Sequence, residues 1–275
     1  MVAQEGGAHA HRERVVNQQA GAALSLDHVS IVFGGLKAVS DLCLDVHPGE
    51  LVGLIGPNGA GKTTVFNLIT GVYMPTSGTI RFGETVLNGR RPHTICHLGL
   101  ARTFQNTRLF AGLSCLDNVK IAAHQHAKSS YWDGMWATPG SARDERAIDE
   151  KARLLLDTLS LSDVADTRAA DLPYGRQRRL EIARALATDP KLLLLDEPAA
   201  GMNPQETDAL MHLIEDVRKR FALAVLLIEH DMKVVMGICQ RIAVLDYGVK
   251  ICEGSPEAVR SDPATIRAYL GEDVA

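Results

Sequence analysis

The sequence lacks long apolar runs, an excess of basic residues and closely paired cysteines. No apolar stretch approaches the roughly 20 residues that a membrane-spanning helix needs, and the longest, residues 51–56 and 222–228, have the length of buried strands. The net charge of −4 and the pI near 6.2 argue against nucleic acid as the main partner, because phosphate binding needs a concentrated basic surface. The five cysteines include no CxxC pair, so we expect free thiols rather than a metal site or disulfides.

The first 22 residues also lack the apolar segment of a secretory signal. They offer too little apolar surface to offset the entropy lost on ordering, so we expect residues 1–23 to form a flexible tail. Across the chain, 46% of the residues are apolar and 23% are charged, a balance that can bury a sizeable core. The length of 275 residues fits one large α/β domain, or one core with a smaller lobe.

Hydrophobic patterning predicts an N-terminal β subdomain and a parallel sheet. Residues 24–55 alternate in the manner of strands, and Gly-Gly and Pro-Gly turns separate them. From about residue 174 onward, strands that are apolar throughout alternate with helices. That alternation is typical of a parallel sheet covered on both faces. We therefore expect an α/β core that carries an antiparallel β subdomain at its N-terminus.

The pattern between about residues 91 and 170 is helical instead. Its clearest segment, residues 142–161, places apolar residues on one face and charged residues on the other. We expect Ser141 to cap the start of this helix. We interpret residues from about 107 to 173 as a helical lobe inserted into the core, so that one domain spans residues 24–275.

A glycine-rich loop follows the strand 51–55 and opens a helix that we expect to run from about Lys62 to Gly71. It matches GxxxxGK[ST] in the strand–loop–helix setting that the pattern requires, which indicates a phosphate-loop (RecA-like) core. The glycines let main-chain N–H groups surround phosphate oxygens. Lys62 would reach the β- and γ-phosphates, and the Thr63 hydroxyl would ligate Mg²⁺. The predicted nucleotide-binding residues of the loop are Gly56, Pro57, Asn58, Gly59, Ala60, Gly61, Lys62, Thr63 and Thr64.

Two carboxylates and a histidine follow apolar strands further along the chain. Residues 192–195 run into Asp196 and Glu197, and another apolar strand ends just before His230. Because ligands bind at the carboxyl ends of parallel strands, we expect these side chains near the phosphate loop. Asp196 would hold Mg²⁺ mostly through water, Glu197 would polarise the attacking water, and His230 would reach the γ-phosphate. Considered alone, an Asp-Glu pair after a strand can also be a solvated turn, and a histidine at a strand end can also be purely structural.

Further segments make the chain resemble the ATP-binding subunits of ABC transporters. LPYGRQRRL, residues 172–180, is similar to the signature motif of that family. Gln105 in RTFQNTRLF corresponds to its Q-loop, and His230 corresponds to its H-loop. The resemblance covers nearly the whole chain after residue 24. It extends to the ATPase subunits of branched-chain amino-acid importers, through segments such as LDEPAAGMNP, LLIEHDMKVVM and IRAYLGE.

The resemblance implies that the chain hydrolyses ATP, with Mg²⁺, to power solute import. Together with the loop and strand-end residues, it gives these candidate catalytic residues: Glu197, His230, Gln105 and Lys62. The candidate metal-holding residues are Thr63, Gln105 and Asp196. Residues expected to contact nucleotide outside the loop are Phe33, which would stack on adenine, and the signature residues Tyr174, Gly175 and Arg176, which would meet nucleotide held by a second cassette.

The family also implies partners and a location. In such importers two ATPase subunits, alike or different, lie beneath two membrane-spanning permease subunits, and an extracytoplasmic solute-binding protein delivers the cargo. We therefore expect a peripheral protein on the cytoplasmic face of the inner membrane, with no nucleic-acid partner. Gln105 would sense the γ-phosphate and move the surface around residues 107–113, which would receive a helix of the permease.

The chain departs from the family pattern in its signature and D-loop segments, and several functions stay open. The signature serine is Pro173 here, the following glycine is Tyr174, and the D-loop aspartate is Asn203. The cargo could be urea, an amide or another small solute rather than an amino acid. A soluble ABC protein without transport usually has two cassettes in one chain. A phosphate-loop kinase would have no use for the signature segment.

Overall fold

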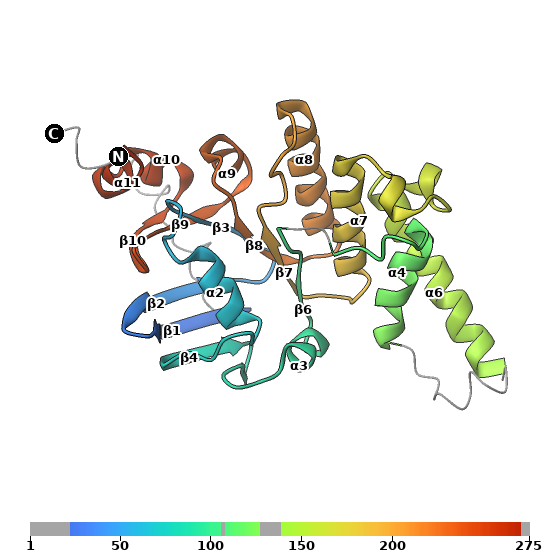
Figure 1. Cartoon of the computed structure of the whole chain (residues 1–275), viewed down its shortest axis with the longest axis horizontal. Coiled ribbons are helices and arrows are strands. Elements are labelled where there is room, and N and C mark those ends of the chain that lie inside the picture. Colours follow the sequence, from blue (N-terminus) through green and yellow to red (C-terminus); the bar gives the residue numbers. More distant parts are fainter. Residues whose placement is uncertain (1–22, 106–107, 127–138, 271–275) are drawn as a thin grey trace, which may run out of the picture.

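The computed structural model describes residues 23–105, 108–126 and 139–270. Two β-sheets and the surrounding helices make up this part of the chain, as Figure 1 shows. The tail predicted over residues 1–23 lies outside the described residues, apart from residue 23. The helices are α2 Lys62–Ile69, α3 Pro92–His97, α4 Cys115–Ala123, α6 Pro139–Thr158, α7 Tyr174–Leu186, α8 Pro204–Arg220, α9 Met232–Ile238, α10 Pro256–Ser261 and α11 Pro263–Leu270. Within the described ranges, no helix has the length and apolar character needed to span a bilayer.

The first sheet is antiparallel and has four strands in the order β2-β1-β4-β5. Its strands are β1 Leu24–Phe33, β2 Leu36–Val46, β4 Ser77–Phe82 and β5 Thr85–Val86. Leu24 and Leu26 of β1 are buried, because the period of two in a strand puts alternate side chains on the same face. The predicted antiparallel β subdomain is therefore confirmed.

The second sheet has six strands in the order β10-β9-β3-β8-β7-β6. Its strands are β3 Leu51–Ile55, β6 Leu100–Arg102, β7 Leu192–Asp196, β8 Ala224–Ile228, β9 Arg241–Asp246 and β10 Val249–Gly254. All neighbours pair in parallel except β10, which is antiparallel to β9. The helical interpretation of the stretch that includes β6 is wrong there, because β6 is a strand paired with β7. Three residues are too few to show strand alternation.

The six-stranded sheet is buried on both faces, which explains why its strands are apolar throughout. Leu193 and Leu195 of β7 pack in one cluster with residues of α7 and α8. Leu192 and Leu194 pack in a second cluster with α2 and the antiparallel sheet. Because successive side chains of a strand point to opposite faces, one leucine run serves both clusters. Figure 1 shows the antiparallel sheet and the α4–α6 pair at opposite ends of the view.

The chain between β6 and β7 contains α4, α6 and α7, which contact one another. The apolar face predicted for α6 is buried, with Ile148, Ala152 and Leu155 in the core. The helix begins at Pro139, so the capping role predicted for Ser141 is wrong. Proline suits the first turn of a helix, because no N–H donor is needed there.

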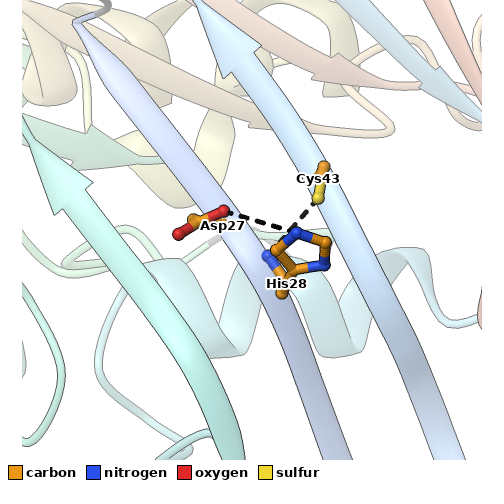
Figure 2. A group of neighbouring side chains, drawn as sticks. All are labelled: Asp27, His28 and Cys43. Atoms are coloured by element: carbon orange, nitrogen blue, oxygen red, sulfur yellow. Dashed lines mark hydrogen bonds and ion pairs between the residues drawn. The ribbon is translucent and has the colours of Figure 1, made fainter.

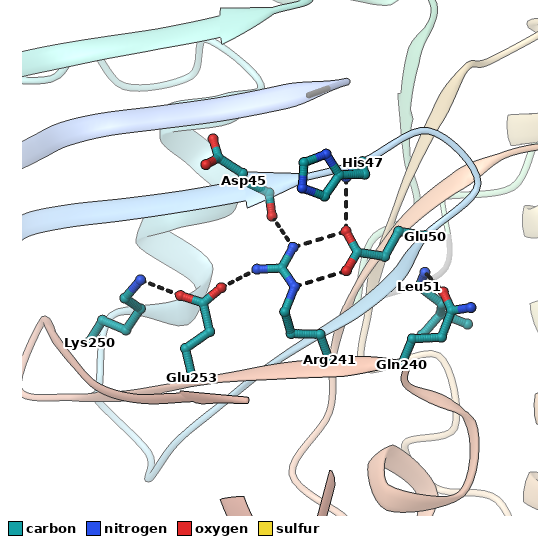
Figure 3. Close-up of polar contacts among 8 residues, drawn as sticks. All are labelled: Asp45, His47, Glu50, Leu51, Gln240, Arg241, Lys250 and Glu253. Carbon is teal, nitrogen blue, oxygen red and sulfur yellow. Dashed lines mark hydrogen bonds and ion pairs between the residues drawn. The ribbon is translucent and has the colours of Figure 1, made fainter. Parts of the chain in front are cut away.

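A polar network around Arg241 joins the two sheets (Figure 3). The guanidinium of Arg241, on β9, donates to the two carboxylate oxygens of Glu50 at 2.8 and 2.9 Å and to the main-chain oxygen of Asp45 at 2.5 Å. It also forms an ion pair with Glu253 of β10. A two-pronged arginine–carboxylate pair fixes geometry as well as adding energy. The network therefore holds the end of β2 against the C-terminal hairpin.

Candidate functional site

The turn after β3, residues 56–61, follows a path that only glycine can take at two positions. At Gly56, φ is 150° and an added Cβ would collide with the main-chain oxygen of Leu245. At Gly61, φ is 102° and a Cβ would lie 2.6 Å from the main-chain oxygen of Ala38 on β2. Glycine adopts positive φ at little steric cost. The chain can therefore turn tightly between β3 and the first residue of α2, Lys62.

Lys62 is buried, and its ammonium group is held within this turn. Its Nζ donates to the main-chain oxygen of Gly56 at 2.6 Å and to that of Pro57 at 2.9 Å. Burial lowers the pKa of Lys62, while the carboxylates of Glu197 and Asp196 oppose that shift. Arg102 bonds both Asp196 at the end of β7 and Asn67 of α2, so the end of β7 lies near the helix that Lys62 begins.

Asp196, the last residue of β7, forms a buried ion pair with Arg102 at the end of β6. Arg102 Nη2 and Asp196 Oδ2 are 2.8 Å apart, and the two side chains are 7% and 6% exposed. The guanidinium also donates to Asn67 of α2 at 2.8 Å and lies 5.1 Å from the centroid of the Phe104 ring. Sequence reasoning missed Arg102. Its partner lies 94 positions away, and the three-residue strand β6 shows no pattern of its own, so no local signal pointed to it.

Glu197 follows Asp196 and takes a left-handed main-chain conformation, with φ of 45°. Its N–H donates to the main-chain oxygen of Ile228 on β8 at 2.9 Å. Its carboxylate Oε2 accepts a hydrogen bond of 2.7 Å from Gln105 Nε2. Non-glycine residues at positive φ are uncommon and cluster at functional sites. The structure thus joins the candidate general base to the candidate Q-loop residue, 92 positions away in the chain.

His230 lies at the same edge of the six-stranded sheet. Ile228 of β8 pairs with Asp196 of β7, so both strands end side by side. The His230 side chain is 61% exposed, and its Nδ1 lies 3.8 Å from the carboxylate of Glu229. No contact among the described residues joins His230 to Lys62 or to the carboxylates of Asp196 and Glu197. Its role at the γ-phosphate stays a prediction.

Phe33 ends β1 with a half-exposed ring. It pairs across the hairpin with Leu36, two residues before Ala38, whose oxygen packs against Gly61. The ring therefore belongs to the hairpin end that lies beside the turn. It meets Tyr73 edge to face, with centroids 5.1 Å apart. Two partly exposed rings offer a surface to a flat aromatic ligand. Sequence reasoning did not predict Tyr73.

The predicted signature residues begin α7: Tyr174, Gly175 and Arg176. Pro173 is the N-cap of this helix, so the proline is compatible with a helix start. Asn203 caps α8, because its side chain accepts the N–H of Glu206 at 3.0 Å. All three departures from the family pattern thus occupy helix starts. Among the described contacts, none joins the signature residues to the chain's own turn after β3.

A separate group of side chains on the antiparallel sheet could supply metal ligands (Figure 2). Asp27, His28 and Cys43 offer ligand atoms within 4.8 Å of one another. However, His28 Nδ1 lies 2.8 Å from Asp41 Oδ1, and the His28 N–H donates to Cys43 Sγ at 3.4 Å. Asp27 and His28 are also highly exposed. We assign this group no role, and the cysteines among the described residues are free thiols.

Comparison with known proteins decides the family. The ABC transporter family matches residues 39–200, and a family described as branched-chain amino acid ATP-binding cassette transporter matches residues 249–275. The high-affinity branched-chain amino acid transport ATP-binding protein LivG of Escherichia coli strain K12 is 47% identical over 249 residues, covering 90% of this chain and 98% of LivG. This chain belongs to the ABC transporter family.

Other proteins are similar to this ABC cassette in sequence and in fold. The BraF protein of Pseudomonas aeruginosa, also a branched-chain amino acid transport ATP-binding protein, is 46% identical and covers 90% of this chain and 98% of BraF. The solved structure of MJ1267, an ATP-binding cassette of an ABC transporter, superposes with a TM-score of 0.79 at 29% identity, covering 91% of this chain and 99% of MJ1267. The predicted family and fold class are confirmed. ABC ATP-binding proteins bind and hydrolyse ATP and work with permease subunits.

Proposed function

We propose that this cassette hydrolyses ATP to drive the import of branched-chain or other hydrophobic amino acids. The observation that carries the proposal is the 2.7 Å hydrogen bond between Gln105 and Glu197. It joins a candidate general base to the segment that leads from the sheet into the helices α4 and α6. The relatives LivG and BraF, together with the C-terminal family match, favour this class of cargo.

The residues around the turn suit phosphoryl transfer to water. Lys62 would exchange the oxygens of the turn for phosphate oxygens, while main-chain N–H groups and the N-terminus of α2 bind the remaining negative charge. Glu197 would orient and deprotonate the attacking water, and Gln105 would hold its carboxylate in place. Phe33 would stack on adenine, and His230 would contact the γ-phosphate. Positioning and charge stabilisation would supply most of the rate.

The donor set at the sheet edge fits Mg²⁺. The hydroxyl of Thr63, the amide oxygen of Gln105 and the carboxylate of Asp196 are hard oxygen ligands, which this ion prefers together with several waters. Gln105 uses its nitrogen to bond Glu197, and Asp196 uses Oδ2 to bond Arg102. Gln105 Oε1 and Asp196 Oδ1 are then the candidate ligand atoms. When bound, the ion would neutralise charge on the phosphates.

A second cassette would complete the site. Tyr174, Gly175 and Arg176 begin a helix, and a helix N-terminus favours anions. Their described contacts, such as the 2.7 Å pair of Arg176 with Asp163, do not include the chain's own turn, and they would meet the γ-phosphate of nucleotide held by a second copy or a paralogous ATPase. Loss of that phosphate would remove the charge that both faces grip, and the pair would open.

The segment after Gln105 would receive the permease. Its predicted surface, residues 107–113, is described from residue 108 onward. A cavity of about 370 Å³ next to it is lined by residues that include Phe104, Arg108 and Arg184, and Phe110 is 45% exposed. An apolar pocket edged by arginines suits the end of a helix. The cassette would thus lie peripherally on the cytoplasmic face of the inner membrane, beneath two permease subunits and, indirectly, a solute-binding protein.

The alternative cargo is urea, an amide or another small solute, since other subunits choose the cargo. A soluble ABC ATPase without transport is the minor alternative. Neither has support from LivG and BraF, which are branched-chain amino acid transport ATP-binding proteins.

The test is the change of Lys62→Ala in the cassette assembled with its permease and ATPase partners in lipid vesicles, with the solute-binding protein supplied. We expect ATP hydrolysis and uptake of labelled leucine to fall by about 100-fold or more, because one preorganised positive charge at the phosphates is lost. Circular dichroism should be unchanged. The control is Lys219→Ala, an exposed lysine on α8, which should keep full activity. Full ATP hydrolysis by Lys62→Ala would exclude the assigned nucleotide site. Uptake of urea but not of leucine by the wild type would show that the cargo is urea and not an amino acid.

A further inference from the structure

Arg178 lies one turn into α7, and only 2% of it is exposed. Its Nε donates to the hydroxyl of Tyr174 at 2.9 Å, and its guanidinium lies 5.0 Å from the centroid of that ring. Its Nη1 donates to the main-chain oxygen of Phe104 at 2.8 Å, and Nη2 donates to the main-chain oxygen of Gln105. One buried side chain therefore ties the first turn of α7 to the segment that carries Gln105.

Glu181, nearly one turn further along α7, completes this attachment. Its Oε2 accepts a hydrogen bond from Arg178 Nη1 at 3.0 Å, and its Oε1 accepts the N–H of Phe104 at 3.2 Å. The pair thus uses both main-chain groups of Phe104 and the oxygen of Gln105. Buried ion pairs can fix geometry even where they add little stability. Here the geometry that is fixed is that of the main chain at Gln105.

The contacts continue from Gln105 to the carboxylate of Glu197, through the 2.7 Å bond already described. They form an unbroken line from Glu197 through Gln105 and Arg178 to Tyr174. We propose that Arg178 is a positioning residue that couples the nucleotide site of this chain to the orientation of its own signature helix. The inference rests on the proposed function, in which Tyr174 meets the nucleotide of a second cassette. Through Arg178, each ATP site would then influence the other.

The planar fork of arginine suits this task, because it presents N–H groups to separate acceptors in a fixed geometry, whereas lysine has a single nitrogen. Arg178→Lys therefore keeps the charge and loses the link. Tyr174→Phe keeps the ring and removes only the hydroxyl acceptor, so it serves if the buried substitution fails to fold. The matched control is Arg153→Lys on α6, whose side chain is 59% exposed.

The first readout is hydrogen–deuterium exchange of the full chain with and without Mg²⁺ and the ATP analogue AMP-PNP. In the wild type and in Arg153→Lys, we expect the analogue to slow exchange both in residues 56–64 and at the start of α7. In Arg178→Lys and Tyr174→Phe, protection should persist in residues 56–64 and be lost at residues 174–178. An equal response of α7 in all variants would overturn the inference. Absence of protection at residues 56–64 in the wild type would instead remove the proposed nucleotide site itself.

The second readout is a double-mutant cycle in the assembled transporter. Arg178→Lys should lower kcat by about tenfold, because small misplacements of catalytic groups are costly, while the KM for ATP changes less than twofold. In a Gln105→Ala background, Arg178→Lys should have little further effect, since both changes break one line of contacts. If the fold-losses in kcat of the two single variants multiply in the double variant, the two residues act independently. Arg178 would then merely support the fold, and the inference would be wrong.

Discussion

At the scale of single residues, the charge of Asp196 is balanced by Arg102. The two groups come from neighbouring strand ends, and their side chains are almost fully removed from water. A buried carboxylate that loses its partner stays charged at a large cost or takes up a proton. Arg102 therefore offsets the cost of burying the charge of this candidate metal ligand.

Arg102→Met should lower the free energy of unfolding by about 3–5 kcal/mol, because it leaves a buried charge without its partner. Urea denaturation at neutral pH measures the loss. Arg81→Met, on the exposed side of β4, is the control and should change stability by less than about 0.5 kcal/mol. Adding Asp196→Asn to Arg102→Met should restore part of the loss. A single-mutant loss no larger than that of the control would contradict this prediction.

Residues whose signal is local could be predicted from the sequence, and residues that act through distant partners could not. Lys62 can be predicted from the spacing of glycines in a nine-residue loop, and Glu197 can be predicted because it follows directly on an apolar strand. Arg102 bonds a partner 94 positions away in the chain, and Arg178 bonds acceptors 73 and 74 positions away. Neither pairing leaves a periodic pattern in the sequence.

At the scale of elements, the network around Arg241 links β9 to the turn between β2 and β3. Burial alone would raise the pKa of Glu50, but hydrogen bonds from Arg241 and from the N–H of His47 hold it below its usual value of 4.5. A carboxyl whose folded pKa is depressed contributes stability above its unfolded pKa. That contribution is lost as the pH falls through the folded pKa.

Arg241→Gln should therefore destabilise the protein by about 2 kcal/mol at pH 7, the usual worth of hydrogen bonds to a charged group. The difference from the wild type should shrink as the pH falls below 4.5 and Glu50 becomes protonated. Urea denaturation at a series of pH values between 3.5 and 7 checks this. Arg260→Gln, on the exposed side of α10, is the control. If the difference in the free energy of unfolding between Arg241→Gln and the wild type stays constant with pH, Glu50 is not the group whose protonation causes the loss.

Elements of five residues or more with a clear period could be predicted, whereas short ones could not. The strands β3, β7 and β8 show as apolar runs because both of their faces are buried. The strand β6 has only three residues, and its pairing with β7 decides its conformation rather than its own pattern. The start of α6 at Pro139 was missed because a serine nearby matched a capping pattern more closely.

At the scale of the whole molecule, the candidate site has two halves, and among the described residues no direct contact joins the signature residues to the turn after β3. The turn after β3 lies with Glu197, while the signature residues begin α7. Such a layout fits the proposed second cassette, and the geometry of that pairing cannot be predicted from one sequence, because the complementary surface would belong to another chain.

Glu197→Gln should form a dimer in ATP, with itself or with its paralogous ATPase, and stay monomeric without nucleotide. The amide keeps the shape of the side chain but cannot take a proton from water, so bound ATP persists and holds both faces. Gel filtration measures the change. The double variant Lys62→Ala/Glu197→Gln should stay monomeric, because its grip on phosphate is lost. A Glu197→Gln variant that remains monomeric at saturating ATP, alone and with its paralogue, would rule out the shared site.

The turn before β10 meets two other segments through main-chain atoms. The N–H of Gly248 donates to the oxygen of Ala60 at 2.9 Å, and its oxygen accepts the N–H of Ser40 at 2.8 Å. An added Cβ on Gly248 would lie 2.6 Å from the oxygen of Ala38. Because this junction needs backbone atoms and a bare glycine, mutations in the side chains of the β1–β2 hairpin leave it intact. The side chains of this hairpin, which includes Phe33, can therefore vary without changing the main-chain contacts that support the turn after β3.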